Sequence, residues 1–306
     1  MKNNKKYFVV SDIHSFFKPF SEALNKAGFD LGNKNHILLI LGDVFDRGPD
    51  TLPLYDFIMS IPKDRRILVR GNHESLYKDL LEKKFPQSHD FSNGTVDTFC
   101  QIANLPGINR NGIENGYYFR EGSFYDTERI SEESQKLWDL VLEEVRKSEI
   151  TNWIKSDEWI NYYELDKYIF VHSFIPAKIK KEFEQYRLYF QMVNHPQTCE
   201  YDPNWRQADD YTWEEAMWGC PWKNYLQGLS KPEHEKGKVI VCGHWHSYAF
   251  REHLDGVVYT NINEIDFGIY YSKDLIAIDA CTSFSNQCNV MVIDDDNNGQ
   301  EKGSKV

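Results

Sequence analysis

Residue types that can bind metal ions follow five short apolar runs of the sequence, which occupy residues 7–10, 37–41, 67–69, 168–171 and 238–242. The candidate donors are two carboxylates, one carboxamide and four imidazoles: Asp12, His14, Asp43, Asn72, His172, His244 and His246. Mixed nitrogen and oxygen donors suit manganese, iron or zinc better than calcium or magnesium, which prefer oxygen alone. The sequence therefore predicts a transition-metal site.

The number and spacing of these donors predict two ions. Seven donors are too many for one tetrahedral ion and suit two ions that share a bridging carboxylate. Asp43 is the expected bridge, because its strand is expected to lie between the others. Asp12 and His14 lie two residues apart, so they can project to the same side of an extended chain. The same spacing lets His244 bind one ion and His246 the other.

The five apolar runs are expected to be the strands that position these donors. They have strand length, they are rich in β-branched and aromatic residues, and they lack polar alternation, which indicates burial on both faces. Helices are expected over 20–30, ending near Gly28, and over 51–62, ending at Pro62. This order predicts a parallel sheet, in which ligands bind beyond the carboxyl ends of the strands.

The rest of the chain is less regular. We expect one domain over 1–293, with helical or loop insertions at about 85–165 and 180–236. The polar segment 294–306 is expected to be a disordered tail.

Two shorter segments carry their own predictions. Residues 131–147 have apolar side chains on one face of a helix, with Ser131 as the expected N-cap. Residues 257–294 resemble successive antiparallel strands.

Composition narrows the class of protein. The 306-residue chain is 41% hydrophobic and 15% aromatic, which is enough for a large core. Its net charge of −12, without a basic run, argues against a nucleic-acid scaffold or an anionic membrane as partner. The six cysteines form no C-x-x-C pair and are expected to be reduced. No apolar segment has the length of a signal peptide core or a membrane span, so a cytoplasmic protein is expected.

The motifs around the donors resemble those of the calcineurin-like metallophosphoesterase superfamily. D-x-H, G-D-x-x-D-R-G, G-N-H-E, V-H and G-H-x-H occur in that order. The spacing also matches, with 27 residues between His14 and Gly42 and 22 between Gly48 and Gly71. The resemblance implies an α/β fold, an αββα sandwich of two mixed β-sheets flanked by helices.

Within the superfamily, residues 7–74 look most like the serine/threonine protein phosphatases of the PPP type, including bacterial and phage enzymes, and the related symmetrical bis(nucleosyl)-tetraphosphatases. The resemblance implies a metal-bridging hydroxide that attacks phosphorus. It also implies two divalent ions, most simply manganese, with iron or zinc as alternatives. One ion would take Asp12, His14 and Asp43, and the other would take Asp43, Asn72, His172 and His244.

The same resemblance assigns roles to three residues outside the metal shell. Arg47 would hold two phosphate oxygens, and His73 would protonate the leaving oxygen. Asp46 would orient His73 and keep it cationic. The chain departs from the family pattern at Cys220, where a second phosphate-binding arginine is usual, so this contact is either missing or supplied elsewhere, for example by Arg206 or Lys223. Phe174 stands where the family usually has glycine and would narrow the site.

Three functions remain open at this point. The first is hydrolysis of phosphoserine or phosphothreonine in proteins. The second is hydrolysis of dinucleoside polyphosphates or another small phosphoester, which Trp245 and the aromatic insertions favour slightly because a base could stack there. The third is a non-catalytic binding protein with the same fold, which the intact Asp46, Arg47 and His73 argue against.

Overall fold

The computed structural model describes residues 5–115, 117–118, 129–186 and 191–294. Its first sheet has the order β14-β1-β2-β3-β6. The strands are β1 (Lys6–Val10), β2 (His36–Leu41), β3 (Arg66–Val69), β6 (Trp159–Ile160) and β14 (Met291–Asp294). The strands β1, β2, β3 and β6 are parallel, and β14 is antiparallel to β1.

The second sheet has the order β12-β13-β11-β8-β7. Its strands are β7 (Tyr162–Glu164), β8 (Tyr168–Val171), β11 (Val239–Cys242), β12 (Tyr270–Tyr271) and β13 (Leu275–Ala277). Here β8, β11 and β13 are parallel, whereas β7 and β12 pair antiparallel at the two edges. The five predicted strands are thus confirmed, three in one sheet and two in the other.

The two sheets pack face to face and are covered by helices outside. Alternate residues of β1 show the layers: Tyr7 and Val9 pack against Phe170 of the second sheet, whereas Phe8 and Val10 belong to the core under the helices. A third core lies on the outer face of the second sheet. Two mixed sheets flanked by helices are the predicted fold class, which is confirmed.

Helices α1 (Phe17–Ala27) and α2 (Thr51–Ser60) connect the first three strands, as predicted. Gly28 ends α1 in the left-handed conformation with φ of 83°, which glycine adopts without strain. The α2 helix ends just before Pro62, which cannot continue a helix because it lacks an N–H.

A large helical segment lies between β3 and β6. It contains α3 (Asn72–Glu82), α4 (Ser88–Ser92), α5 (Thr95–Ala103), α6 (Arg110–Glu114), β4 (Tyr117–Tyr118), β5 (Arg129–Ile130), α7 (Glu132–Lys147) and α8 (Glu149–Ile154). The Ser131 hydroxyl accepts the N–H of Ser134, so the predicted N-cap of α7 is confirmed.

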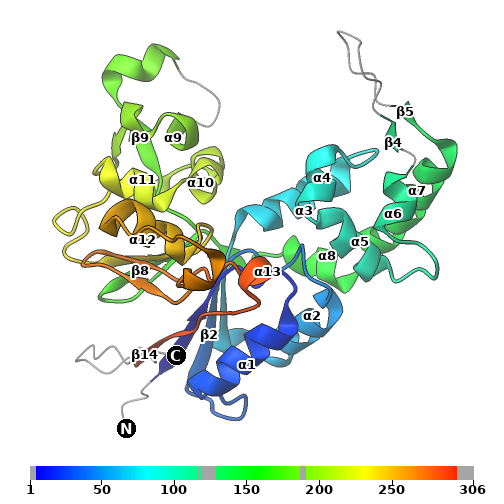
Figure 1. Cartoon of the computed structure of the whole chain (residues 1–306), viewed down its shortest axis with the longest axis horizontal. Coiled ribbons are helices and arrows are strands. Elements are labelled where there is room, and N and C mark those ends of the chain that lie inside the picture. Colours follow the sequence, from blue (N-terminus) through cyan, green and yellow to red (C-terminus); the bar gives the residue numbers. More distant parts are fainter. Residues whose placement is uncertain (1–4, 116, 119–128, 187–190, 295–306) are drawn as a thin grey trace.

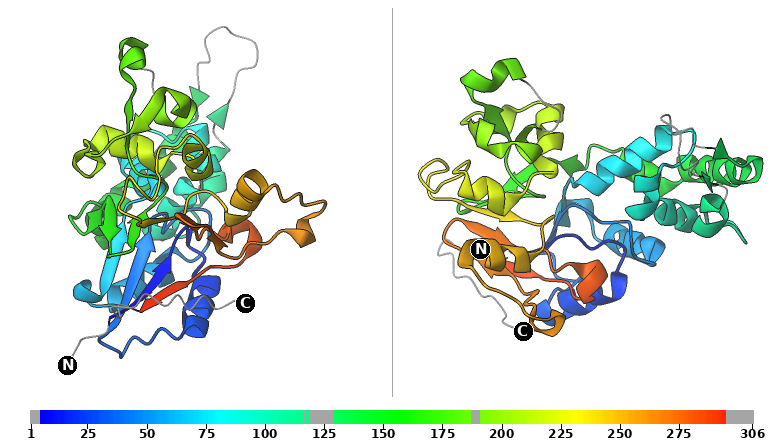
Figure 2. Two further views of the ribbon diagram at one scale, coloured as in Figure 1. Left: turned by 90° about the vertical axis from the view of Figure 1, so that its left-hand side faces the viewer. Right: turned by 45° about the horizontal axis from the view of Figure 1, so that its top comes forward.

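A second segment follows β8. It contains β9 (Ala177–Ile179), α9 (Gln191–Asn194), β10 (Cys199–Tyr201), α10 (Asp210–Met217) and α11 (Pro221–Leu226). Short 3-10 turns lie at Lys63–Arg65, Lys181–Tyr186, Pro196–Thr198, Trp205–Gln207 and Ile262–Glu264. In Figure 1 the second segment lies at the upper left and the helical segment between β3 and β6 lies at the right, and the left view of Figure 2 shows both above the sheets. The division into one domain with two insertions stays a prediction.

The prediction of successive antiparallel strands over 257–294 is confirmed for β12 and β13, which pair antiparallel, and is wrong for β14. After β11, helix α12 (Ser247–Asp255) crosses over, and β13 then joins β11 in parallel. A short helix, α13 (Thr282–Ser285), separates β13 from β14, which pairs with β1 in the other sheet. Pairing partners distant in the sequence decide these directions, and the local pattern does not contain them. The predicted tail beyond Asp294 lies outside the described residues.

No helix in the described ranges combines the length and the apolar character that a membrane span needs.

Candidate metal centre

The candidate donors lie on the loops that follow the strands, at the carboxyl ends of the strands of both sheets. Asp12 and His14 follow β1, Asp43 follows β2, and Asn72 begins α3 directly after β3. His172 follows β8 and His244 follows β11. Asp12, His14, Asp43, Asn72 and His172 each expose 3% or less of their surface. The predicted convergence of the strand ends is therefore present in the structure.

The backbone of these loops is held in a costly conformation. Among the described residues, eleven other than glycine have positive φ, and six of them are candidate site residues. The six are Asp12 (50°), His14 (52°), Asp43 (53°), Asp46 (75°), Arg47 (65°) and His244 (62°). A left-handed residue with a side chain costs roughly 1–2 kcal/mol. Such strain persists where surrounding contacts enforce it, and it gathers at functional sites.

One group of donor atoms, which we call the Asn72 half, surrounds Nε2 of His172. This nitrogen lies 2.8 Å from Asn72 Oδ1, 3.3 Å from His244 Nδ1 and 3.4 Å from Asp43 Oδ1. Nδ1 of His172 lies 2.7 Å from the carbonyl oxygen of Leu41, which only accepts, so Nδ1 carries the proton. The Nε2 lone pair therefore faces other lone pairs, an arrangement that a cation between them satisfies.

A second group, the Asp12 half, surrounds Nε2 of His14. This nitrogen lies 4.0 Å from Asp12 Oδ1 and 3.8 Å from Asp43 Oδ2. Nδ1 of His14 donates to the carbonyl of Phe45 at 3.0 Å, which again leaves the lone pair on Nε2. Arg47 Nη1 lies 2.8 Å from that nitrogen and donates to it.

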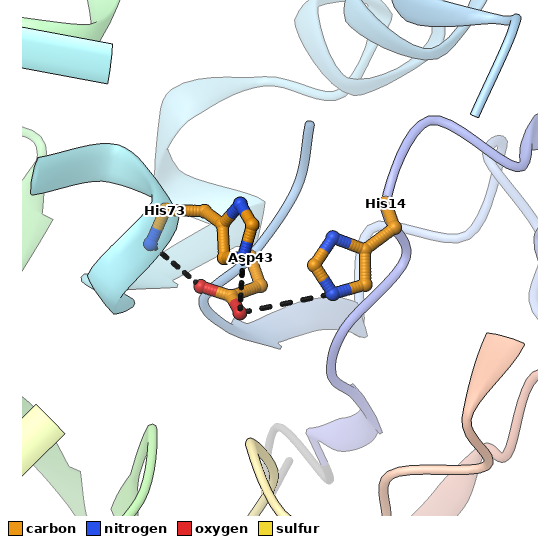
Figure 3. Close-up of side chains that lie close together, drawn as sticks. All are labelled: His14, Asp43 and His73. Carbon is orange, nitrogen blue, oxygen red and sulfur yellow. Dashed lines mark hydrogen bonds and ion pairs between the residues drawn. The ribbon is translucent and has the colours of Figure 1, made fainter. Parts of the chain in front are cut away.

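Asp43 contributes one carboxylate oxygen to each half. Its Oδ1 faces His172 and accepts the backbone N–H of His73 at 3.0 Å. Its Oδ2 lies 3.8 Å from His14 Nε2 and 3.9 Å from His73 Nε2 (Figure 3). Burial raises the pKa of Asp43 well above its usual value, and the charges of Asp12 and Glu74 raise it further. Two cations would offset this crowding of negative charge, so the donor set fits the predicted pair.

The residues predicted to supply and orient the general acid, His73 and Asp46, lie beside this centre. His73 Nδ1 lies 2.6 Å from Asp46 Oδ2, so the carboxylate accepts the ring N–H and Nε2 faces the donors. Arg47 Nη2 lies 3.1 Å from that Nε2, and the side chain of Arg47 is exposed at the mouth of the site. Burial raises the pKa of Asp46 to about 7, against hydrogen bonds from Thr98 and Thr95 that lower it.

Several site residues were not predicted. The carboxylate of Glu74 accepts the backbone N–H groups of Gly71, Asp43 and Val44 at 2.7, 3.0 and 3.0 Å, and so ties two of the donor loops together. Its place after G-N-H was the available signal. Asp279 is 2% exposed, and both its burial and the charge of Asp12 raise its pKa. Its place after the apolar run 275–278 was the available signal.

His246 lies outside both halves. Its Nε2 is 3.9 Å from Asp279 Oδ2, its ring stacks on Tyr248 with centroids 5.5 Å apart, and 36% of its side chain is exposed. The charge of Asp12 is near enough to raise its pKa, although burial lowers it more. Ligation by His246 stays a prediction.

The structure shows where the residues lie that bear on the two departures from the family pattern. Arg206 pairs with Glu164 and with Glu235 and lies over the ring of Trp205, so its guanidinium is already engaged in the second segment. Phe174 is 1% exposed and belongs to the core of the second sheet, where it fills space in the interior. Lys223, in α11, stays a prediction as a second phosphate contact.

The calcineurin-like phosphoesterase family matches residues 5–248, a span that contains every candidate donor. A symmetrical bis(5'-nucleosyl)-tetraphosphatase of Buchnera aphidicola is 39% identical over 67 residues, which are 22% of this chain and 23% of that protein. The asymmetrical bis(5'-nucleosyl)-tetraphosphatase PrpE of Bacillus cereus is 26% identical over 121 residues, 37% of this chain and 48% of that protein. The matches thus span a quarter to a half of these curated relatives.

Two solved structures align with nearly the whole chain. A protein serine/threonine phosphatase from Saccharomyces cerevisiae covers 98% of this chain and 80% of its own, with 13% identity and a TM-score of 0.48. A mutant of a cold-active protein tyrosine phosphatase covers 98% of this chain and 80% of its own, with 16% identity and a TM-score of 0.47.

Proposed function

Because the chain belongs to the calcineurin-like phosphoesterase family, we propose that it is a metal-dependent hydrolase of phosphate esters. The observation that carries the proposal is the convergence of the Asp12 half and the Asn72 half on Asp43, with His73 and Arg47 beside them. A donor cluster alone would be enough for a metal-binding protein. Hydrolysis of a phosphate ester also needs a general acid and a guanidinium beside the metal donors, as His73 and Arg47 are here.

In this proposal the Asp12 half holds one ion through Asp12, His14 and Asp43. The Asn72 half holds the other through Asp43, Asn72, His172 and His244. We assign manganese to both positions, with iron or zinc as alternatives, because the donors mix imidazole nitrogen with oxygen. When bound, two such ions supply Lewis acidity toward phosphate oxygens and a nucleophile at neutral pH.

Arg47 binds the phosphoryl group of the substrate. Its planar guanidinium can donate to two phosphate oxygens at once and oppose the charge that grows on them. In the structure it donates to the ring nitrogens of His14 and His73. The lone pair of His14 Nε2 cannot serve an ion and Arg47 together. Arg47 must therefore leave His14 when the site is loaded. It must also leave Nε2 of His73 when that nitrogen carries the proton of the acid, which frees the guanidinium for the substrate.

His73 protonates the leaving oxygen through Nε2. The carboxylate of Asp46 accepts the proton on Nδ1 at 2.6 Å, which fixes the ring and directs Nε2 toward the centre. Burial and the charge of Arg47 lower the pKa of His73. The negative charge of a bound phosphate would work in the opposite direction and favour the protonated acid.

The first candidate substrate class is phosphoserine or phosphothreonine in proteins, and the motifs of residues 7–74 favour it. The second is a dinucleoside polyphosphate, which the names of the curated relatives favour. Two indoles also flank the ring of His244, with centroid distances of 6.0 Å to Trp218 and 6.1 Å to Trp245. A groove of about 590 Å³ beside Trp218, which Ser75 and Lys78 also line, could hold a nucleoside.

One experiment tests the proposal and separates the candidates. The protein is reconstituted with Mn²⁺, and turnover is compared on phosphopeptides, p-nitrophenyl phosphate, bis-nucleoside tetraphosphates and cyclic nucleotides. Chelation should abolish activity and Mn²⁺ should restore it. Activity that survives chelation in protein without bound metal would refute the proposal. Bound metal without turnover on any substrate would favour a non-catalytic binding protein.

A further inference from the structure

Helix α5, which lies in the helical segment between β3 and β6, makes direct contact with Asp46. The hydroxyl of Thr98 donates to Asp46 Oδ1 at 2.7 Å and accepts the backbone N–H of Asp46 at 3.0 Å. The hydroxyl of Thr95 donates to Asp46 Oδ2 at 2.9 Å. Both threonines are fully buried, so no water competes for these bonds. Each carboxylate oxygen of Asp46 therefore has a fixed donor from α5.

The same face of α5 continues along the loop. Gln101, three residues after Thr98, donates through Nε2 to the carbonyl of Gly48 at 2.9 Å. Its Oε1 accepts the backbone N–H of Thr51 at 3.0 Å. Residues three apart lie on one face of a helix, so Thr95, Thr98 and Gln101 form a single contact surface for the loop 46–51.

The start of α5 lies so close to the loop that only glycine fits. A Cβ at Gly94 would come within 2.4 Å of the backbone nitrogen of Arg47. Gly94 also has φ of +83°, which disfavours any side chain. Both the lack of a side chain and the positive φ of Gly94 thus favour glycine at the place where α5 approaches Arg47.

The loop needs such support because Asp46 and Arg47 are both left-handed, with φ of 75° and 65°. Two consecutive residues of this kind relax unless their surroundings hold them. The bond from the Asp46 N–H to Thr98 holds the peptide group that enters this turn.

We propose that Thr95 and Thr98 of α5 are positioning residues for the general acid, acting through Asp46. The inference deepens the proposed hydrolysis and depends on it. Thr98 binds Oδ1 of Asp46 and Thr95 binds Oδ2, so the carboxylate is held with Oδ2 directed toward His73 Nδ1. The bond between Oδ2 and Nδ1 then orients the ring so that Nε2 meets the leaving oxygen. A helix outside the two sheets would then control turnover without touching substrate or metal.

The test uses isosteric valine variants, Thr95→Val, Thr98→Val and the double variant, in the full Mn²⁺-loaded chain. We expect kcat for an alkyl phosphate to fall by about 10–100-fold in the double variant, as for other residues that orient a reacting group. KM and metal content should change little. An activated aryl phosphate needs little protonation and should lose far less. Thr95→Ser with Thr98→Ser should restore the kcat for the alkyl phosphate.

A matched control is Thr151→Val. Thr151 is also buried in the same helical segment, but its hydroxyl bonds Tyr77 and the carbonyl of Val145 and not Asp46. Its variant should lower the melting temperature and leave the alkyl-to-aryl ratio of kcat unchanged. NMR of ¹⁵N-histidine protein gives a second readout, because the Nδ1–H signal of His73 should shift or broaden in the double variant and not in the control.

Equal slowing on both substrates, or the same ratio change in Thr151→Val, would overturn the proposal. If the double valine variant does not fold, the single variants and the serine pair decide by the same ratio. Failure of the proposed function gives a different result, because the unaltered, metal-loaded protein would then hydrolyse none of the substrates. The positioning role is tested separately by NMR. An undisturbed Nδ1–H signal of His73 in the valine variants would refute it.

Discussion

The two halves of the metal centre differ in how closely their donor atoms approach. In the Asn72 half, Nε2 of His172 lies 2.8 Å from Asn72 Oδ1 and 3.3 Å from His244 Nδ1. In the Asp12 half, Nε2 of His14 lies 4.0 Å from Asp12 Oδ1, and Arg47 donates to it. The Asn72 half is thus already close to the geometry of an ion site, whereas the Asp12 half must release an arginine first.

The difference follows from the elements that supply the donors. Asn72 starts a helix of eleven residues, and His172 is fixed by the carbonyl of Leu41 at the end of β2. His14 is likewise fixed by the carbonyl of Phe45, but Asp12 and His14 stand on a short left-handed loop and not on a helix. We therefore expect the Asn72 half to bind its ion more tightly than the Asp12 half, with Asp43 coupling the two.

The largest effect is expected from Asp43→Asn, because it removes the one charge that both halves share. Both ions should be lost and turnover should fall to background. Elemental analysis gives the metal content, and Asp64→Asn, at an exposed position away from the centre, is the matched control. A variant that still holds two ions per chain would show that the halves are independent.

His73→Asn should separate the acid from both halves. Loss of a general acid costs about 10²–10⁴-fold for substrates with poor leaving groups. Activated aryl phosphates should be spared, and both ions should remain bound. His73 Nε2 lies 3.9 Å from Asp43 Oδ2, so ligation is the competing role. Loss of one ion would assign His73 to the metal shell, and equal slowing of both substrate types would make it a binding residue.

A pair of variants should weaken the two halves one at a time. Asn72→Ala should lower the affinity of the Asn72 half at least about tenfold, and His246→Ala should do so for the Asp12 half. Competition with a chelator, followed ion by ion, measures both. If His246→Ala leaves both affinities unchanged, His246 is a surface histidine, and the site resembles the protein-phosphatase branch more closely.

The smallest effect concerns pH. Burial and the charge of Asp12 raise the pKa of Asp43 well above that of a free aspartate, so the metal-free carboxyl keeps its proton to a higher pH. Burial lowers the pKa of His14 and His244 below the usual value, so these rings are neutral at neutral pH and release no proton. Below the pKa of Asp43, ion binding must expel the carboxyl proton, so in that range affinity should rise with pH, about tenfold per unit for each proton released. Metal titration at two pH values measures it, and a pH-independent affinity would contradict this protonation state.

Most of the fold near the site could be predicted from local sequence. The five apolar runs became strands because short runs of β-branched and aromatic residues, without polar alternation, suit strands that are buried on both faces. Gly28 and Pro62 marked helix ends by backbone chemistry alone. The segment 257–294 was misread in part, beyond the antiparallel pair of β12 and β13, because its short runs fit a strand in either direction. Only β11 and β1, as partners, decide which direction each strand takes.

The sequence by itself determined that the candidate donors stand at strand ends, because each of them follows an apolar run. The tertiary structure alone decided which groups orient them. Glu74 reaches the backbone of Asp43 from a different element, and Thr98 reaches Asp46 across 52 positions of sequence. A buried hydroxyl such as that of Thr98 belongs to no periodic pattern and to no motif. It meets its partner only when packing brings α5 against the loop after β2, and the local sequence does not predict that contact.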